Sequence, residues 1–113
     1  MYDKNKVIKL MEDNLGICEK IYKGEDSKAF SESQETINNN IVFTEFIEMI
    51  PKLQQLGVDI PIEVILQQLK NLVDAYEYRD SMLLADTLRY EINDSLQVYL
   101  EILEQLEKEN IML

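Results

Sequence analysis

Five acidic residues in the second half of the chain have the spacing to face one another across a pair of helices. Carboxylates are the ligands that hard cations such as Mg²⁺ prefer, and they bind such cations without nitrogen or sulfur ligands. The sequence therefore leaves open a carboxylate-dependent metal-binding enzyme. Solvated acidic faces of amphipathic helices are the simpler interpretation. The residues concerned are Asp74, Glu77, Asp86, Glu91 and Asp94.

The chain contains no histidine and a single cysteine. Histidine is the commonest general base and a common transition-metal ligand, so its absence excludes Ser-His-Asp and Cys-His catalysis. The three glycines, Gly16, Gly24 and Gly57, lie too far apart to form a phosphate-binding loop. The sequence therefore predicts no catalytic residue, no metal site and no cofactor, and we expect a protein that is not an enzyme.

The cysteine lies on the apolar stripe of a helix predicted over residues 2–22. A small thiol at such a position is expected to be buried. One cysteine cannot form an intramolecular disulfide, which is compatible with a reducing compartment and favours a cytoplasmic protein. The stripe consists of Val7, Met11, Leu15, Cys18 and Tyr22.

Three of the six tyrosines, Tyr76, Tyr90 and Tyr99, lie on or beside predicted core stripes. A buried tyrosine hydroxyl needs a hydrogen-bond partner, and Asp86 or Glu91 could accept such a bond. One interpretation is a polar cross-brace between helices. The other is a tyrosine-lined groove for a partner helix, because tyrosine is enriched at the energetic centres of protein interfaces.

The apolar spacing predicts four helices that position these side chains. The first ends at Lys23-Gly24, where glycine accepts the left-handed conformation that closes a helix. The second extends over residues 27–56, and Pro51 is expected to kink or end it because proline lacks an amide donor. The polar run Asn38-Asn39-Asn40 is a further candidate break in this helix.

The third and fourth helices are predicted over residues 61–78 and 81–106. Tyr78-Arg79-Asp80 is either a tight turn in which Asp80 caps the fourth helix or part of one unbroken helix. The turn is favoured because an unbroken helix would be far too long for a compact chain of 113 residues. The fourth helix carries a regular apolar stripe, namely Ala85, Leu88, Ile92, Leu96, Tyr99, Leu103 and Leu106. We therefore expect a single all-α domain over residues 1–113, an up-down antiparallel four-helix bundle.

The formal net charge is −11, and residues 57–113 hold 12 acidic and 4 basic residues. Nucleic-acid binding requires a cationic surface, and anionic membranes repel an acidic protein in the same way. The longest apolar runs also fall short of the roughly 20 residues that a membrane-spanning helix needs. We therefore expect neither a nucleic-acid nor a membrane partner.

A motif from Ala75 to Ile92 has the pattern Ala-x-Glu-x-x-Asp-x-x-x-Leu-Ala-Asp-x-Leu-x-Tyr-Glu-Ile. It resembles the C-terminal signature of an uncharacterised family of small acidic helical proteins from Gram-positive bacteria. Gly24-Glu25 and Val58-Asp59-Ile60 are similar to the helix boundaries of that family. The resemblance implies a helical fold and no function. In size, charge and composition the chain also resembles flagellar and type III export chaperones.

The expected function is a non-catalytic protein–protein interaction module, an adaptor or chaperone-like bundle that binds a helix of another protein. The alternatives are an export chaperone and the carboxylate-dependent metal enzyme described above. Self-association is a further expectation, because the stripe of the fourth helix is long enough to pair with a second copy. The predicted contact surface, here called the predicted patch, is Tyr78, Asp86, Arg89, Tyr90, Glu91 and Asp94.

Overall fold

The computed structural model describes residues 3–39 and 42–111, with the side chains of residues 37–39 and 43 left out. Over these residues the chain is helical, without a β-strand, which confirms the all-α prediction. The elements in order are α1 (Lys4–Tyr22), α2 (Asp26–Asn39), α3 (Val42–Gln55), α4 (Ile62–Tyr78), α5 (Ser81–Asp86), the π-helical segment η1 (Thr87–Ile92) and α6 (Asn93–Lys108).

The described residues form five helices, not the four that the sequence predicts, because α5, η1 and α6 continue into one another. The extra helix comes from the predicted second helix. It is divided into α2, which ends at Asn39, and α3, which begins at Val42; the Asn40 part of the expected break lies outside the described residues. Of the two effects expected of Pro51, a kink or an end, the end is wrong, because α3 includes Pro51 and continues to Gln55.

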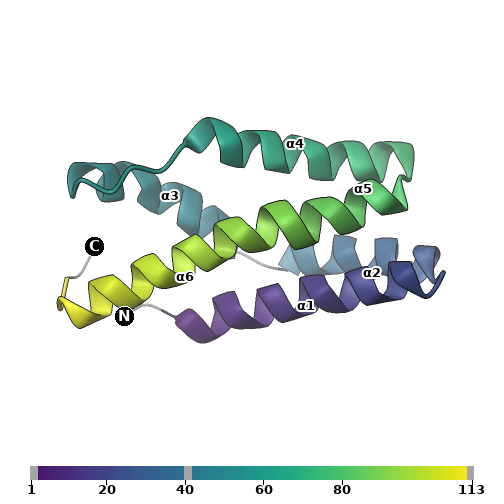
Figure 1. The fold of residues 1–113 in the computed structure, drawn as a ribbon, viewed down its shortest axis with the longest axis horizontal. Coiled ribbons are helices and arrows are strands. Elements are labelled where there is room, and N and C mark those ends of the chain that lie inside the picture. The colour runs from purple at the N-terminus through teal and green to yellow at the C-terminus, as the bar shows by residue number, and fades with distance from the viewer. Residues whose placement is uncertain (1–2, 40–41, 112–113) are drawn as a thin grey trace.

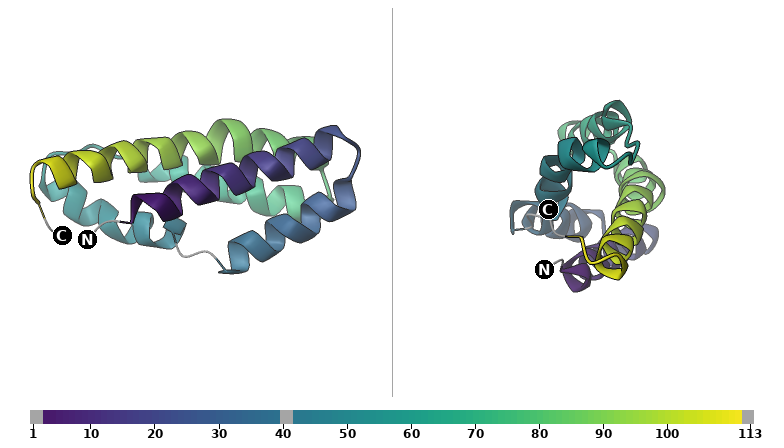
Figure 2. Two further views of the ribbon diagram at one scale, coloured as in Figure 1. Left: turned by 90° about the horizontal axis from the view of Figure 1, so that it is seen from below. Right: turned by 90° about the vertical axis from the view of Figure 1, so that its left-hand side faces the viewer.

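The helices form two layers. Figure 1 shows α1, α4 and the α5–η1–α6 helix in front, with α2 and α3 behind them, and the end view in Figure 2 shows the same arrangement. The α5–η1–α6 helix runs antiparallel to both of its neighbours, α1 on one side and α4 on the other. This helix therefore forms the centre of the front layer.

Two helix boundaries follow directly from local chemistry. Asp3 caps α1 by accepting a hydrogen bond from the Lys6 amide at 3.2 Å. The question of the Tyr78–Asp80 segment is answered in favour of a turn. Arg79 ends α4 in the left-handed conformation (φ 52°), and Asp80 caps α5 by accepting from the Leu83 amide at 3.0 Å.

The core draws apolar side chains from every helix. The whole predicted stripe of the fourth helix, from Ala85 to Leu106, is buried, as its spacing indicates. Phe46 of α3 stacks on Tyr99 of α6 with ring centres 4.4 Å apart, which joins the rear layer to the front one. Tyr76 of α4 contacts Phe30 of α2 edge-to-face, at 6.2 Å between centroids. Across residues 3–39 and 42–111, no helix is long and apolar enough to cross a membrane.

The core face of α1 is rotated from the predicted one. Its buried side chains are Val7, Leu10, Asn14, Ile17, Cys18 and Ile21. Leu15 and Tyr22, which the sequence assigns to the core stripe, are 46% and 51% exposed. The prediction was wrong for these two residues because α1 has two apolar faces, and α2 and the α5–η1–α6 helix cover only one of them.

Candidate functional site

The predicted patch lies mostly on the α5–η1–α6 helix, with Tyr78 at the end of α4. Tyr78 and Tyr90 are 73% and 59% exposed. Asp86, Arg89 and Asp94 are also exposed, whereas Glu91 is half-buried. The residues predicted for the patch are therefore mainly surface residues. Because Tyr90 is exposed, it is not the buried cross-brace between helices that one interpretation predicts.

These six residues do not form one face. Arg89 points toward α1, where its guanidinium lies near the hydroxyl of Tyr22 and the Arg89 pKa is raised by that neighbour. Glu91 points the opposite way, toward α4, and accepts a hydrogen bond from Asn71 at 2.8 Å. Tyr90 lies between them in sequence, and the Arg89 guanidinium is 5.4 Å from its ring centroid. The patch therefore divides between two helix–helix boundaries.

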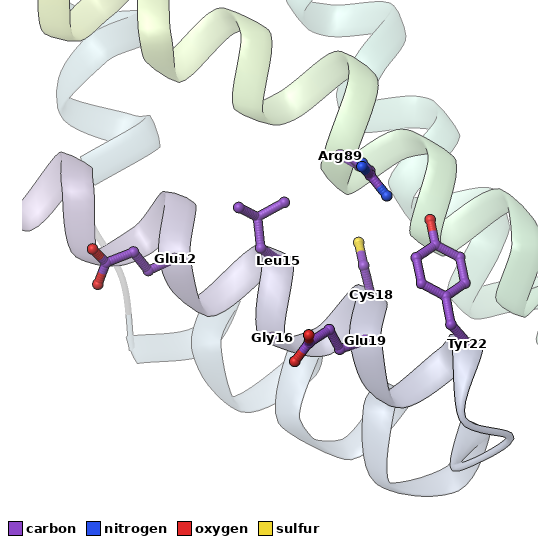
Figure 3. A pocket seen from close by; sticks show the side chains of 7 residues that line it. All are labelled: Glu12, Leu15, Gly16, Cys18, Glu19, Tyr22 and Arg89. Carbon is purple, nitrogen blue, oxygen red and sulfur yellow. The ribbon is translucent and has the colours of Figure 1, made fainter.

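The half of the patch on the α1 side adjoins an open groove of about 570 Å³ (Figure 3). Side chains from α1 and η1 form its walls, and we call it the α1–η1 groove. Its lining residues are Glu12, Leu15, Gly16, Cys18, Glu19, Tyr22 and Arg89. Arg89 is the one member of the predicted patch in this lining.

Leu15 and Tyr22 form the apolar part of the groove and lie seven residues apart on α1. With Ile8, which is 39% exposed, they make a partly exposed apolar stripe at helical spacing; we call it the exposed α1 stripe. Sequence reasoning missed this surface because it counted Leu15 and Tyr22 as core. The available signal was the pattern Ile8, Glu12, Leu15, Glu19, Tyr22, in which apolar and acidic residues alternate at steps of four and three.

Cys18 lies at the bottom of the groove and is buried, as predicted. Its thiol donates to the carbonyl of Ala85 at 3.4 Å. Burial raises the pKa of the Cys18 thiol above its ordinary value, and the nearby Asp86 adds to this, while Arg89 opposes it. The thiol is therefore protonated at neutral pH and poorly suited to act as a nucleophile.

The predicted carboxylate cluster is not assembled. Over residues 3–39 and 42–111, no three Cys, Asp or Glu side chains come close enough together to hold a metal ion. Glu91 is bound to Asn71, and Asp86 lies beside Cys18 on the α1 side. The hydroxyl of Tyr76, for which Asp86 or Glu91 was the expected acceptor, instead bonds to Ser33 of α2.

Several buried polar contacts around α6 were missed. Asn14 of α1 bonds to Asn93 at 2.9 Å, and Ser95 donates to Gln68 of α4 at 2.6 Å. The signal for the first pair was an asparagine at a core position, four residues after Leu10 and four before Cys18. These contacts hold the α5–η1–α6 helix between its two neighbours and so place Arg89 over the groove.

The site is thus an open, partly apolar groove with acidic side chains and one arginine. No known protein family, curated protein or solved structure matches this chain.

Proposed function

We propose that this protein is a non-catalytic interaction module that binds another protein along the α1–η1 groove. The observation that carries the proposal is the exposed α1 stripe. Two large side chains, Leu15 and Tyr22, stand about half exposed on the wall of a groove while the core of α1 is already filled by other residues. Apolar side chains gathered beside a groove are typical of protein-binding surfaces.

The residue types of the groove support the same function. Tyrosine and arginine are enriched at the energetic centres of protein interfaces, and Tyr22 and Arg89 lie close together in the groove lining (Figure 3). Because the Arg89 guanidinium also lies over the Tyr90 ring, part of the entropy cost of ordering the Arg89 side chain is met before a partner binds.

An adaptor and a chaperone-like bundle are both consistent with this proposal, and a flagellar or type III export chaperone is its narrower form. The partner's identity distinguishes them, since an export chaperone would bind an exported protein. We also propose, from the motif between Ala75 and Ile92, that the chain is related to the uncharacterised family of small acidic helical proteins from Gram-positive bacteria.

Photo-crosslinking in the native host tests the proposal. A benzophenone amino acid at Leu15 is expected to capture a partner, whereas the same amino acid at Glu48, exposed on α3, is not. The captured partner is then purified, and its binding to the unmodified protein and to Tyr22→Ala is measured by calorimetry. We expect Tyr22→Ala to weaken binding by tenfold or more, since interface hot spots contribute about 2 kcal/mol each. Equal capture at both positions, or unchanged binding by Tyr22→Ala, would contradict the proposal.

Self-association is a separate proposal, and we now assign it to a surface other than the apolar stripe of the fourth helix. The stripe of the fourth helix is consumed within one chain, so it cannot also pair with a second copy. Leu66 and Val73 of α4 lie two helical turns apart, are 53% and 59% exposed, and offer the alternative contact. Native mass spectrometry of the wild type and of Leu66→Ala/Val73→Ala tests this. A dimer in the wild type that is lost in the variant is expected, and a monomer in both would contradict it.

A further inference from the structure

We infer that the α1–η1 groove binds a basic amphipathic helix of the partner protein, an inference that rests on the proposed function. Along α1 the residues facing the groove alternate between apolar and acidic: Glu12, Leu15, Glu19 and Tyr22 follow at steps of three, four and three. A helix lying along α1 with apolar residues at the same average spacing of about 3.5 would meet Leu15 and Tyr22 in turn. Basic residues beside its apolar stripe would meet Glu12 and Glu19.

The acidic side chains of the groove are available to such a partner. Among the described residues, the salt bridges within the first half of the chain join Lys9 to Asp13 and Lys20 to Glu32. The exposed carboxylates of Glu12 and Glu19 line the groove instead.

The wall opposite α1 carries one charged lining residue, Arg89. Asp86, at the end of α5, adds to the raised pKa of the Cys18 thiol but does not line the groove. Among the described residues, Arg89 is the one cation that lines the groove, against the two carboxylates of Glu12 and Glu19, and it lies over the Tyr90 ring. The groove therefore keeps a net negative charge.

The negative charge of the whole molecule disfavours other molecules that could occupy the groove. A second copy would bring another −11 to the groove, and an anionic nucleic acid or membrane would be repelled in the same way. A basic helix is attracted at long range, which raises its association rate, and is then held by the apolar contacts.

Gly16 gives the groove its low floor between Glu12 and Glu19. A Cβ atom added there would meet no atom within 4 Å, so a side chain at this position enters open space. Its backbone is also helical, and a residue other than glycine favours a helix by up to about 1 kcal/mol. Substitutions at Gly16 therefore alter the groove without threatening the fold.

The test uses a dye-labelled synthetic peptide of about 15 residues, long enough to lie along Glu12–Tyr22, with Leu at helical spacing and Lys elsewhere. A second peptide replaces each Lys by Glu, and a third has the first composition in an order without an amphipathic face. We expect the first peptide to bind, measured by fluorescence anisotropy, and to bind at least tenfold more tightly than the other two. Its affinity is expected to fall several-fold as salt rises from about 0.05 to 0.3 M.

Two pairs of variants locate the site. Gly16→Lys is expected to weaken binding of the basic peptide, whereas Gly16→Glu, of similar length and opposite charge, leaves it unchanged or tighter. Glu12→Gln/Glu19→Gln is expected to weaken binding by about threefold to tenfold. The matched control Glu48→Gln/Glu63→Gln makes the same change of net charge at exposed positions on α3 and α4 and is expected to have little effect.

Amide chemical-shift changes induced by the basic peptide are expected on α1 and η1. Shifts centred on Leu66 and Val73 of α4, equal binding of the acidic peptide, or equal effects of the two Gln pairs would each overturn the inference. The proposed function has its own separate test, because crosslinking at Leu15 reports any protein partner. Capture of a partner at Leu15 together with failure of the basic peptide would overturn the basic-helix inference alone.

Discussion

Asn14 of α1 donates from its Nδ2 atom to Oδ1 of Asn93, 2.9 Å away, in the buried contact between α1 and α6. Asn93 in turn donates from its own Nδ2 to the carbonyl of Met11 at 3.1 Å. Both asparagines are almost fully buried among apolar side chains. A sliding movement of α6 along α1 would leave these amides unpaired, so the pair favours one register of the two helices.

We expect Asn93→Ala to lower the free energy of unfolding by about 2–3 kcal/mol, because it removes two hydrogen bonds and leaves the buried Asn14 amide without its partner. Urea unfolding followed by circular dichroism measures the change. In a double-mutant cycle with Asn14→Ala, the two effects should fall well short of adding. Full additivity would show that the pair contributes nothing jointly to stability.

The π-helical segment begins at Thr87, whose hydroxyl is fully buried and has no hydrogen-bond partner among the described residues. Thr87→Val replaces this hydroxyl with a methyl group of similar size and so removes an unsatisfied polar atom. We expect the free energy of unfolding to rise by about 1 kcal/mol, which corresponds to a few degrees in Tm.

The control for this substitution is Thr87→Ser, which keeps the hydroxyl, loses the methyl group and is expected to be destabilising by about 1 kcal/mol. Thermal unfolding of both variants checks the pair. A Val variant less stable than the Ser variant would show that the Thr87 hydroxyl is satisfied, for instance by water.

Pro51 is exposed and lies inside α3, where it cannot donate an amide hydrogen bond to the carbonyl of Ile47. Pro51→Ala is expected to increase stability by about 1–2 kcal/mol. The gain in helix propensity is about 3 kcal/mol, and it is partly offset by the greater entropy of the unfolded chain without proline. Urea unfolding measures the change in the free energy of unfolding, and Lys52→Ala, at the next exposed position, is the control. A loss of stability in Pro51→Ala would mean that a bend at Pro51 is needed for packing.

Cys18 should make stability depend on pH in the alkaline range. Its pKa is raised by burial, so the folded state disfavours the thiolate. The protonated Cys18 thiol therefore contributes to the free energy of unfolding. This contribution is fully present below the unfolded-state pKa of about 8.5 and is lost as pH rises toward and through the higher pKa of the folded state.

Tyr76, whose pKa is also raised by burial, should act in the same direction above about pH 10. Below that pH the effect of Cys18 is isolated. Because its pKa is raised, we expect the wild type to lose more stability between pH 7 and pH 9.5 than Cys18→Ser does, measured by urea unfolding at each pH. Parallel pH profiles for the two proteins would contradict the assignment to Cys18.

Much of the helical structure could be predicted because it depends on local features. The stripe from Ala85 to Leu106 follows from its spacing alone, and all of it is buried. Asp80 was recognised as a cap because a short acidic side chain before a helix satisfies free amides of the first turn, and it does so here. The helix end after Asn39 agrees with the expected break near Asn38–Asn40. The expected end at Pro51 does not occur, because Phe46, Ile50 and Leu53 pack in the core and α3 continues past the proline.

The sequence by itself determined that this protein is all-α, strongly acidic and without histidine, since propensity, composition and apolar period are properties of the chain alone. Only the tertiary structure decided which of the two apolar faces of α1 is covered, because that depends on the neighbouring helices. It also decided that Arg89 turns to Tyr22 and Glu91 to Asn71, since neighbours on one helix point to different partners. Both partners lie far from Arg89 and Glu91 in sequence and meet them only when the helices pack.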